Sequence, residues 1–177
     1  MKTKSIIWQI SSFVFTGIFG VLMHFLFDLS NQSIFIAPFS SVNESIWEHT
    51  KLLFFPMLIF SLIQYSYIGK THKNFWCIKL ISVALGIILI PVLYYTINGI
   101  FGKTCDWINI AIFFIAVAFC CFLETRLYIK NMFSCNNTNV AFTILILISI
   151  IFVLFTFFTP QIPLFQDPIT KTYGYEC

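Results

Sequence analysis

The chain has 177 residues, of which 59% are hydrophobic, 19% are aromatic and only 10% are charged. Soluble domains carry about 25% charged residues, so this composition excludes an ordinary water-soluble domain and indicates that lipid surrounds most of the surface. The net charge of +3 selects no partner, and nothing in the chain suggests nucleic acid. The sequence contains no P-loop, glycine-rich dinucleotide turn, Gly-x-Ser-x-Gly elbow or haem-type CxxCH motif.

Five apolar segments are long enough to cross a bilayer, which requires about 20 residues per helix. Polar breaks separate them, and Pro160 closes the last segment, because proline cannot continue the backbone hydrogen-bond ladder. We therefore predict an all-α integral membrane protein, a bundle of five transmembrane helices that forms one domain over residues 1–177. The predicted spans are residues 6–27, 47–68, 77–100, 108–129 and 139–159, followed by an extracytoplasmic tail at 160–177.

Lys and Arg residues divide unevenly between the two sides of this predicted bundle. Cytoplasmic loops carry an excess of these residues, and the side of the N-terminus holds seven of them against three on the other side. We therefore expect an N-in, C-out orientation in a plasma membrane, and the abundance of Lys, Asn, Ile and Phe favours a bacterial one. The seven are Lys2, Lys4, Lys70, Lys73, Lys79, Arg126 and Lys130, and the three are Lys51, Lys103 and Lys171.

The six cysteines form no CxxC pair and show no zinc-type spacing. Cys120 and Cys121 fall in the middle of a predicted span, where a thiol behaves as a small hydrophobe. We therefore expect no structural disulfide.

A polar stretch from Ser40 to Lys51 begins the second predicted span and runs without a break into its apolar part. Charges at that depth in a membrane are costly and mark a functional site by default. Glu44 and Glu48 fall at i, i+4 on one helix face, while His49 is rotated by about 100°. Two carboxylates so placed repel each other. We expect Lys51, a protonated histidine, a bound cation or a shared proton to offset that repulsion.

The first predicted span carries glycines and ionisable residues on one helix face. Glycines permit close approach by a neighbouring helix, here the second span. We therefore expect His24 and Asp28 to meet Glu48 and His49 at one depth, and Glu48→Gln to relieve repulsion and raise thermal stability. The residues that recur at three- and four-residue spacing are Gly17, Gly20, Val21, His24 and Asp28.

The same stretch also has a purely structural interpretation. Ser41 and Glu44 fit a capping box, in which each side chain satisfies the other's backbone donor. Trp47 is a residue type that anchors helices at the level of the lipid headgroups. The tail after the last span is dense in turn formers. It either folds back over the bundle, with Asp167 beside Glu48, or frays as an open terminus.

The candidate residues support three functions between which the sequence does not choose. The first is binding or transport of a small polar, cationic or lipid-derived ligand. The second is a lipid-modifying enzyme of isomerase or hydrolase type, with Glu48 and His49 as acid–base partners and His24 and Asp28 as positioning residues. The third is an accessory subunit whose charges pair with another membrane protein. The ligand-binding candidates are His24, Asp28, Asn43, Glu44, Trp47, Glu48, His49, Lys51 and Asp167.

A divalent metal is the one cofactor for which the sequence offers ligands. His24, Asp28, Glu48 and His49 are of the types that suit Zn²⁺, Mn²⁺ or Fe²⁺. Their spacing matches neither HExxH nor the Glu-x-x-His of di-iron bundles. The residue types therefore permit a metal, and the motif does not specify one.

Three segments together resemble a family of small prokaryotic membrane proteins catalogued as a domain of unknown function. They are Gly20 to Asp28, Phe39 to Pro56 with its Asn-Glu-Ser-x-Trp-Glu-His motif, and Pro163 to Thr170. Lys171 stands where related chains tend to have glycine. The resemblance implies the membrane topology and no activity. A fainter, fold-level similarity links the chain to bundles of the emopamil-binding-protein type, which set a His-x-x-x-acid and a following Glu around a lipid pocket.

Overall fold

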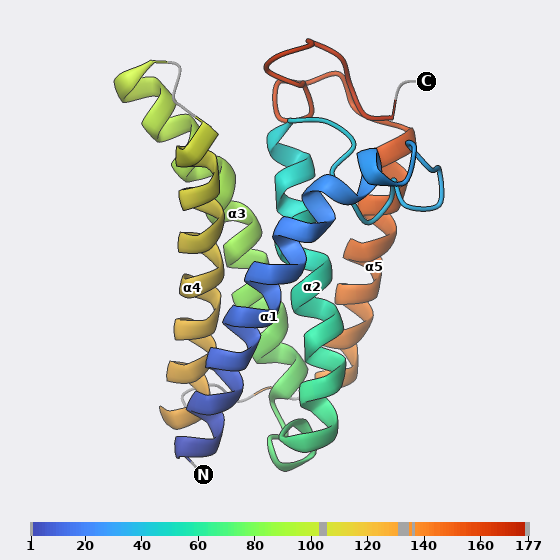
Figure 1. Ribbon diagram of the computed structural model, residues 1–177. Coiled ribbons are helices and arrows are strands. Elements are labelled where there is room, and N and C mark those ends of the chain that lie inside the picture. The colour runs from blue at the N-terminus through green and yellow to red at the C-terminus, as the bar shows by residue number, and fades with distance from the viewer. Residues whose placement is uncertain (1, 103–105, 131–134, 136, 176–177) are drawn as a thin grey trace.

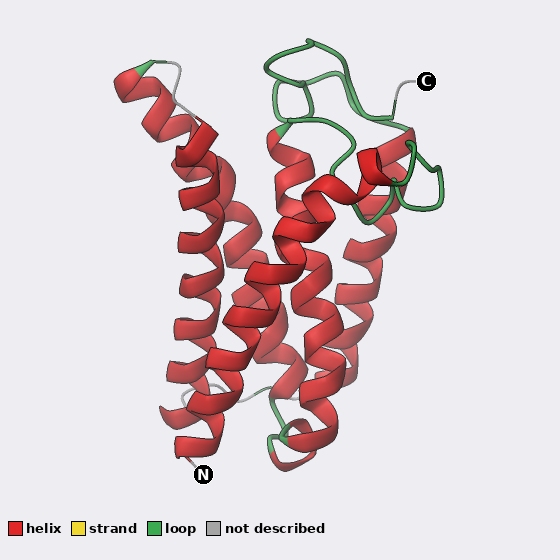
Figure 2. Ribbon diagram, viewed as in Figure 1, coloured by secondary structure: helices red, strands yellow, loops and turns green. Residues whose placement is uncertain are grey.

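The computed structural model describes residues 2–102, 106–130, 135 and 137–175. Its five long helices are long and apolar enough to cross a membrane, and no β-strand occurs among the described residues (Figure 2). The prediction of an all-α, five-span membrane protein is therefore confirmed. The helices are α1 (Lys2–Leu29), α2 (Ile46–Tyr67), α3 (Phe75–Phe101), α4 (Asp106–Lys130) and α5 (Thr138–Phe157), with a short 3-10 turn η1 (Gly69–Thr71) after α2.

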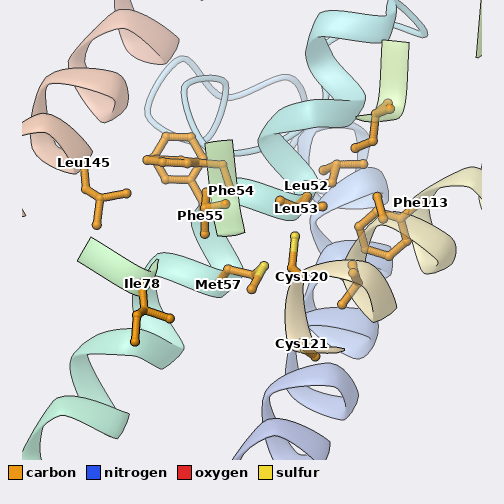
Figure 3. Close-up of a cluster of buried hydrophobic side chains, with 14 of the residues drawn as sticks. Leu52, Leu53, Phe54, Phe55, Met57, Ile78, Phe113, Cys120, Cys121 and Leu145 are labelled. Carbon is orange, nitrogen blue, oxygen red and sulfur yellow. The ribbon is translucent and has the colours of Figure 1, made fainter. Parts of the chain in front are cut away.

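Helix α2 is the central element of the bundle, with α1 crossing it and α4 and α5 on opposite sides (Figure 1). In its apolar stretch two thirds of the residues are buried, whereas less than half are buried in the apolar stretch of each other long helix. Leu53, Phe54 and Met57 of α2 are fully buried, and they belong to one apolar cluster with Cys120 of α4 and Leu145 of α5 (Figure 3). A helix covered in this way must satisfy the charges at its first turn within the protein.

The two ends of the bundle differ in what covers them. The α1–α2 loop and the chain after α5 gather at one end, which we call the tail face, and the N-terminus lies at the other (Figure 1). The tail folds back rather than fraying: the Trp47 backbone N–H donates to the Leu164 carbonyl at 3.1 Å. Phe165 is buried, with its ring centroid 4.6 Å from that of Trp47. Lys103, Glu176 and Cys177, which we assigned to this side, lie outside the described residues.

Two lysines that the charge count places at the two membrane surfaces, near the ends of predicted spans, lie inside the bundle. Lys79 of α3 is fully buried, and its Nζ lies 2.5 Å from Oε2 of Glu124 on α4. Ser82 donates to the other oxygen of that carboxylate at 2.8 Å. Lys51 is likewise fully buried. When the two buried lysines, Lys79 and Lys51, are left out, six Lys and Arg residues remain on the side of the N-terminus against two on the other side. The charge asymmetry between the two sides therefore remains.

The expectation of no structural disulfide is wrong. Cys77 and Cys135 form a disulfide that joins the start of α3 to the α4–α5 connection. The two residues are 58 positions apart, and only the antiparallel course of α3 and α4 brings them together at the end of the bundle that holds the N-terminus. Cys120 and Cys121 are buried and unbridged, as expected, whereas Cys105 lies outside the described residues.

Candidate functional site

Three of the predicted residues converge at the tail face from three different segments of the chain. His24 lies near the end of α1, Glu44 in the α1–α2 loop and His49 in the first turns of α2. Nε2 of His24 lies 3.6 Å from Oε1 of Glu44, and Nε2 of His49 lies 3.5 Å from Oε2. The three side chains form a half-buried cluster, which we call the His–Glu–His cluster.

The start of α2 explains why Glu44 belongs to this cluster. Ser45 is the N-cap, and its hydroxyl accepts from the Glu48 backbone N–H at 3.4 Å. The predicted capping box of Ser41 and Glu44 is therefore wrong, because the helix begins one turn later. Glu44 precedes the helix and points to the histidines, so it does not share a helix face with Glu48.

Glu48, the favoured catalytic candidate, lies away from the histidines in a buried ion pair. Its Oε2 lies 2.5 Å from Nζ of Lys51 and accepts the Val42 backbone N–H at 3.0 Å. Lys51 also donates to the Ala37 carbonyl at 3.2 Å and the Thr156 hydroxyl at 3.0 Å. The predicted grouping of Glu48 with His24 is thus replaced by a pair that joins α2, the α1–α2 loop and α5.

The loop that carries Glu44 is fixed by the folded tail. Asn43 accepts the Ser45 backbone N–H at 2.9 Å and donates through Nδ2 to the Gly174 carbonyl at 3.1 Å. The Glu44 backbone N–H donates to Oδ2 of Asp167 at 3.0 Å. Asp167 therefore lies beside Glu44 rather than beside Glu48, and it holds the Glu44 backbone in place.

The Asp167 carboxylate is itself held by backbone donors. Burial alone would raise the pKa of this carboxyl, but hydrogen bonds from the N–H groups of Glu44, Thr170 and Ile169 lower it below its usual value. Its Oδ1 accepts from Ile169 at 2.6 Å and from Thr170 at 3.0 Å. The carboxylate is thus the charged hub of the tail at neutral pH.

Two further candidates lie outside the cluster. Asp28 is exposed at the end of α1, one turn beyond His24. Trp47 is partly buried against the rings of Phe152, Phe155 and Phe165, so it packs α5 and the tail and is no free interfacial anchor. Neither side chain lines the cavity described next.

A cavity of about 240 Å³ adjoins the His–Glu–His cluster between α1, α2 and α4. Gly20 makes room for it and for close helix packing, because a Cβ there would lie 2.4 Å from the Phe113 ring and 2.9 Å from the Leu52 carbonyl. Gly17 instead faces Phe114 of α4, not α2 as predicted. The lining residues are Gly20, Val21, His24, Phe25, Glu44, His49, Leu52, Asn109, Ile110 and Phe113.

Asn109 on α4 is a site residue that the sequence reasoning missed. Its Oδ1 is buried without a hydrogen-bond partner among the described residues. A buried, unpaired amide oxygen is costly, and the residue that carries it is among those that line the cavity. An amide two residues into an apolar span was the only signal in the sequence.

Two further hollows continue from the cavity along the seam between α1 and α4. The first, of about 420 Å³, shares Val21 with the cavity. The second, of about 340 Å³, shares Phe13 with the first and ends near Gln9 and Thr125. Most of the side chains along both are apolar. A string of hollows thus leads from the polar cluster toward the other end of the bundle, and we call it the α1–α4 seam.

The chain matches DUF6512, a family of unknown function, over residues 1–175, and so belongs to it. This confirms the resemblance to a domain of unknown function. No curated protein and no solved structure matches the chain.

Proposed function

We propose that this member of the DUF6512 family binds an amphiphilic, lipid-derived molecule. The polar head lies at the His–Glu–His cluster, and the hydrocarbon part lies in the α1–α4 seam. The observation that carries the proposal is the cavity, which is lined mostly by apolar side chains and has His24, Glu44 and His49 at one end. Ligand pockets combine such walls with a few convergent polar groups that orient the ligand.

The dimensions of the cavity favour partial rather than complete enclosure of this ligand. Pockets that bury drug-sized molecules measure about 300–1,000 Å³, and the cavity of about 240 Å³ is smaller. A headgroup and the first part of a chain fit there, and the rest of the chain continues into the adjoining hollows. Gly17 and Gly20 have no side chain and therefore leave space along the α1 side of this path.

The cluster lies, in our proposal, on the outer face of a plasma membrane. The six Lys and Arg residues that remain on the side of the N-terminus favour N-in, C-out. The Cys77–Cys135 disulfide lies at the end of the bundle that holds the N-terminus. Disulfides persist in oxidising compartments, so this bond argues for the opposite orientation. We give the charge distribution the greater weight, because six residues contribute to it.

The lipid-modifying enzyme with Glu48 and His49 as partners receives less support from the geometry. Glu48 is committed to Lys51 and Val42, away from the cavity. An accessory subunit is also less favoured, because two buried ion pairs, Glu48–Lys51 and Lys79–Glu124, are completed within this chain.

The test is photolabelling of the purified protein in nanodiscs with a phospholipid that carries a diazirine on its acyl chain. Ile110→Trp fills the cavity, whereas Ile115→Trp, at a similarly exposed position of α4, lines none of the three hollows. We expect labelled peptides from α1 and α4, and at least about a threefold loss of that label in Ile110→Trp alone. Equal labelling of the two variants would overturn the proposal.

A further inference from the structure

We propose that His24, Glu44 and His49 bind a divalent transition-metal ion of the Zn²⁺ class, at the head of the cavity. This inference shares its location with the proposed amphiphile site and deepens it, but it rests on different observations. The donor atoms of the three side chains all lie within 4.8 Å of one another. They come from α1, the α1–α2 loop and α2, so an ion there would tie three segments together.

The spacing of the donors fits ligands of one ion better than it fits hydrogen bonds. Hydrogen bonds to nitrogen measure about 2.7–3.2 Å, whereas the two His–Glu separations are 3.6 and 3.5 Å. Two ligands bound to Zn²⁺ at about 2.0–2.2 Å with tetrahedral angles lie roughly 3.4 Å apart. The two His–Glu separations, one to each oxygen of Glu44, are therefore close to the ligand–ligand spacing of a coordination shell.

The tautomer of His49 is set for coordination. Its Nδ1 lies 2.9 Å from the Ser45 carbonyl oxygen, and a carbonyl can only accept, so Nδ1 carries the proton. In the neutral ring, Nε2 then presents its lone pair toward the Glu44 carboxylate. Metal-binding histidines characteristically donate their other N–H to a carbonyl or carboxylate in this way.

With His49 neutral, its Nε2 and the Glu44 carboxylate are two facing acceptors, which call for a cation or a shared proton between them. The lining of the cavity contains no Lys or Arg among the described residues. Lys51, the basic residue of the same helix turn, is fully buried and committed to Glu48, Ala37 and Thr156. A bound ion would neutralise Glu44, whose backbone Asp167 already holds in place.

The site leaves coordination positions open toward the cavity. Two histidines and one carboxylate occupy three positions, and catalytic or ligand-binding Zn²⁺ sites keep a fourth for water or substrate. Asn109, whose Oδ1 is buried and unpaired among the described residues, is one of the residues that line that cavity. Imidazole and carboxylate ligands suit Zn²⁺, Fe²⁺ or Co²⁺ more than Mg²⁺ or Ca²⁺, which prefer oxygen alone. An oxygen of an anionic headgroup is the natural ligand for the open position.

The experiment measures Zn²⁺ binding by the full-length protein after stripping with a chelator. We expect about one Zn²⁺ per chain, and a loss of affinity of more than about 100-fold in His24→Ala, His49→Ala and Glu44→Gln, since removing an outer partner alone costs about 10–100-fold. The chain has three histidines. His72→Ala removes the third one, between η1 and α3, and Asp28→Asn removes the exposed acid beside the site. Both should keep wild-type binding.

A second measurement covers variants that fail to fold. Co²⁺ added to the stripped wild-type protein should give the intense visible absorption of a four- or five-coordinate ion, and Zn²⁺ should displace it. A weak spectrum like that of hydrated Co²⁺, or Zn²⁺ affinity unchanged in all three cluster variants, would overturn the metal site. Zn²⁺ binding together with equal photolabelling of Ile110→Trp and Ile115→Trp would sink only the amphiphile proposal, and the reverse result only the metal.

Discussion

Glu48→Gln is the substitution for which sequence and structure make opposite predictions. The sequence places Glu48 beside Glu44, so that removing its charge should relieve repulsion and raise stability. In the structure Glu48 is 1% exposed and Lys51 is 0% exposed, and their charged atoms lie 2.5 Å apart. Glutamine at position 48 would leave the Lys51 ammonium buried with neutral acceptors only, namely the glutamine amide oxygen, the Ala37 carbonyl and the Thr156 hydroxyl.

The expected magnitude follows from the burial of both partners. Removing one member of a buried ion pair costs about 3–5 kcal/mol, because the remaining charge is left uncompensated. At about 2–4 °C per kcal/mol for a chain of this size, the thermal midpoint should fall by about 6–20 °C. The double variant Glu48→Gln, Lys51→Met removes both charges at similar volume and should recover most of that loss.

The assay is thermal unfolding of the purified protein in detergent, followed by the monomer peak in size-exclusion chromatography. Wild type, both single variants and the double variant form a mutant cycle that isolates the pair from its neighbours. A midpoint for Glu48→Gln equal to or above that of wild type would refute the ion pair and restore the repulsion model.

Three other predictions concern the rest of the site and its placement. Gly20→Leu should destabilise the protein by about 1–3 kcal/mol or more, because the leucine side chain would meet an aromatic ring of α4 and the backbone of α2. Gly99→Leu is the control, since a Cβ at that position meets nothing within 4 Å, and it should be neutral in the same thermal assay. Because the pKa of the Asp167 carboxyl is lowered by folding, the charged carboxylate stabilises the protein fully at neutral pH, and this stabilisation is lost as the pH falls below about 4. The difference in melting temperature between wild type and Asp167→Asn should therefore shrink below that pH. A cysteine placed after Thr170 should react with an impermeant maleimide from outside intact cells, and one beside Lys70 should not. The opposite pattern would show the reverse orientation, which the disulfide favours and the charge distribution does not.

The five helices were predictable because the bilayer imposes a simple physical requirement. Each span needs about 20 apolar residues, and the breaks between the runs are short and polar, so composition along the chain locates each helix within a few residues. Which helix lies at the centre was less accessible. The mostly buried α2 and the mostly exposed α5 are both apolar enough to span a bilayer. The charges at the start of α2, with Ser61 and Gln64 further along it, give α2 a mean hydropathy of 1.4 against 3.0 for α5.

Pairings between distant residues could not be predicted in the same way. Lys79 meets Glu124, and Cys77 meets Cys135, because α3 and α4 lie antiparallel with a particular rotation. Local spacing contains no information on that rotation. The charge rule therefore counted Lys79 among the surface charges on the side of the N-terminus, although α4 supplies a buried carboxylate for it.

The role of Glu44 shows how a distant segment decides a local question. The sequence contains two consecutive capping boxes, Ser41-x-x-Glu44 and Ser45-x-x-Glu48, and each alone could begin α2. In the first box the Glu44 N–H would donate to the Ser41 hydroxyl. In the structure it donates to Asp167 of the tail, and the Ser41 hydroxyl donates to the Asn43 carbonyl instead.

The tail therefore selects Ser45 rather than Ser41 as the N-cap of α2, and this choice gives Glu44 and Glu48 different roles. With Ser45 as N-cap, Glu48 lies inside the first turn, where Lys51 at i+3 can reach it. Glu44 is left outside the helix, turned toward the histidines. A carboxylate 123 residues away in sequence thus sets which glutamate faces the cavity. Asp167→Ala should consequently weaken Zn²⁺ binding at His24, Glu44 and His49 by about 10–100-fold, as expected of an outer-shell partner, while Lys171→Ala, in the same turn and exposed, should leave it unchanged. Equal Zn²⁺ affinity in the two variants would show that the loop holds Glu44 without the tail.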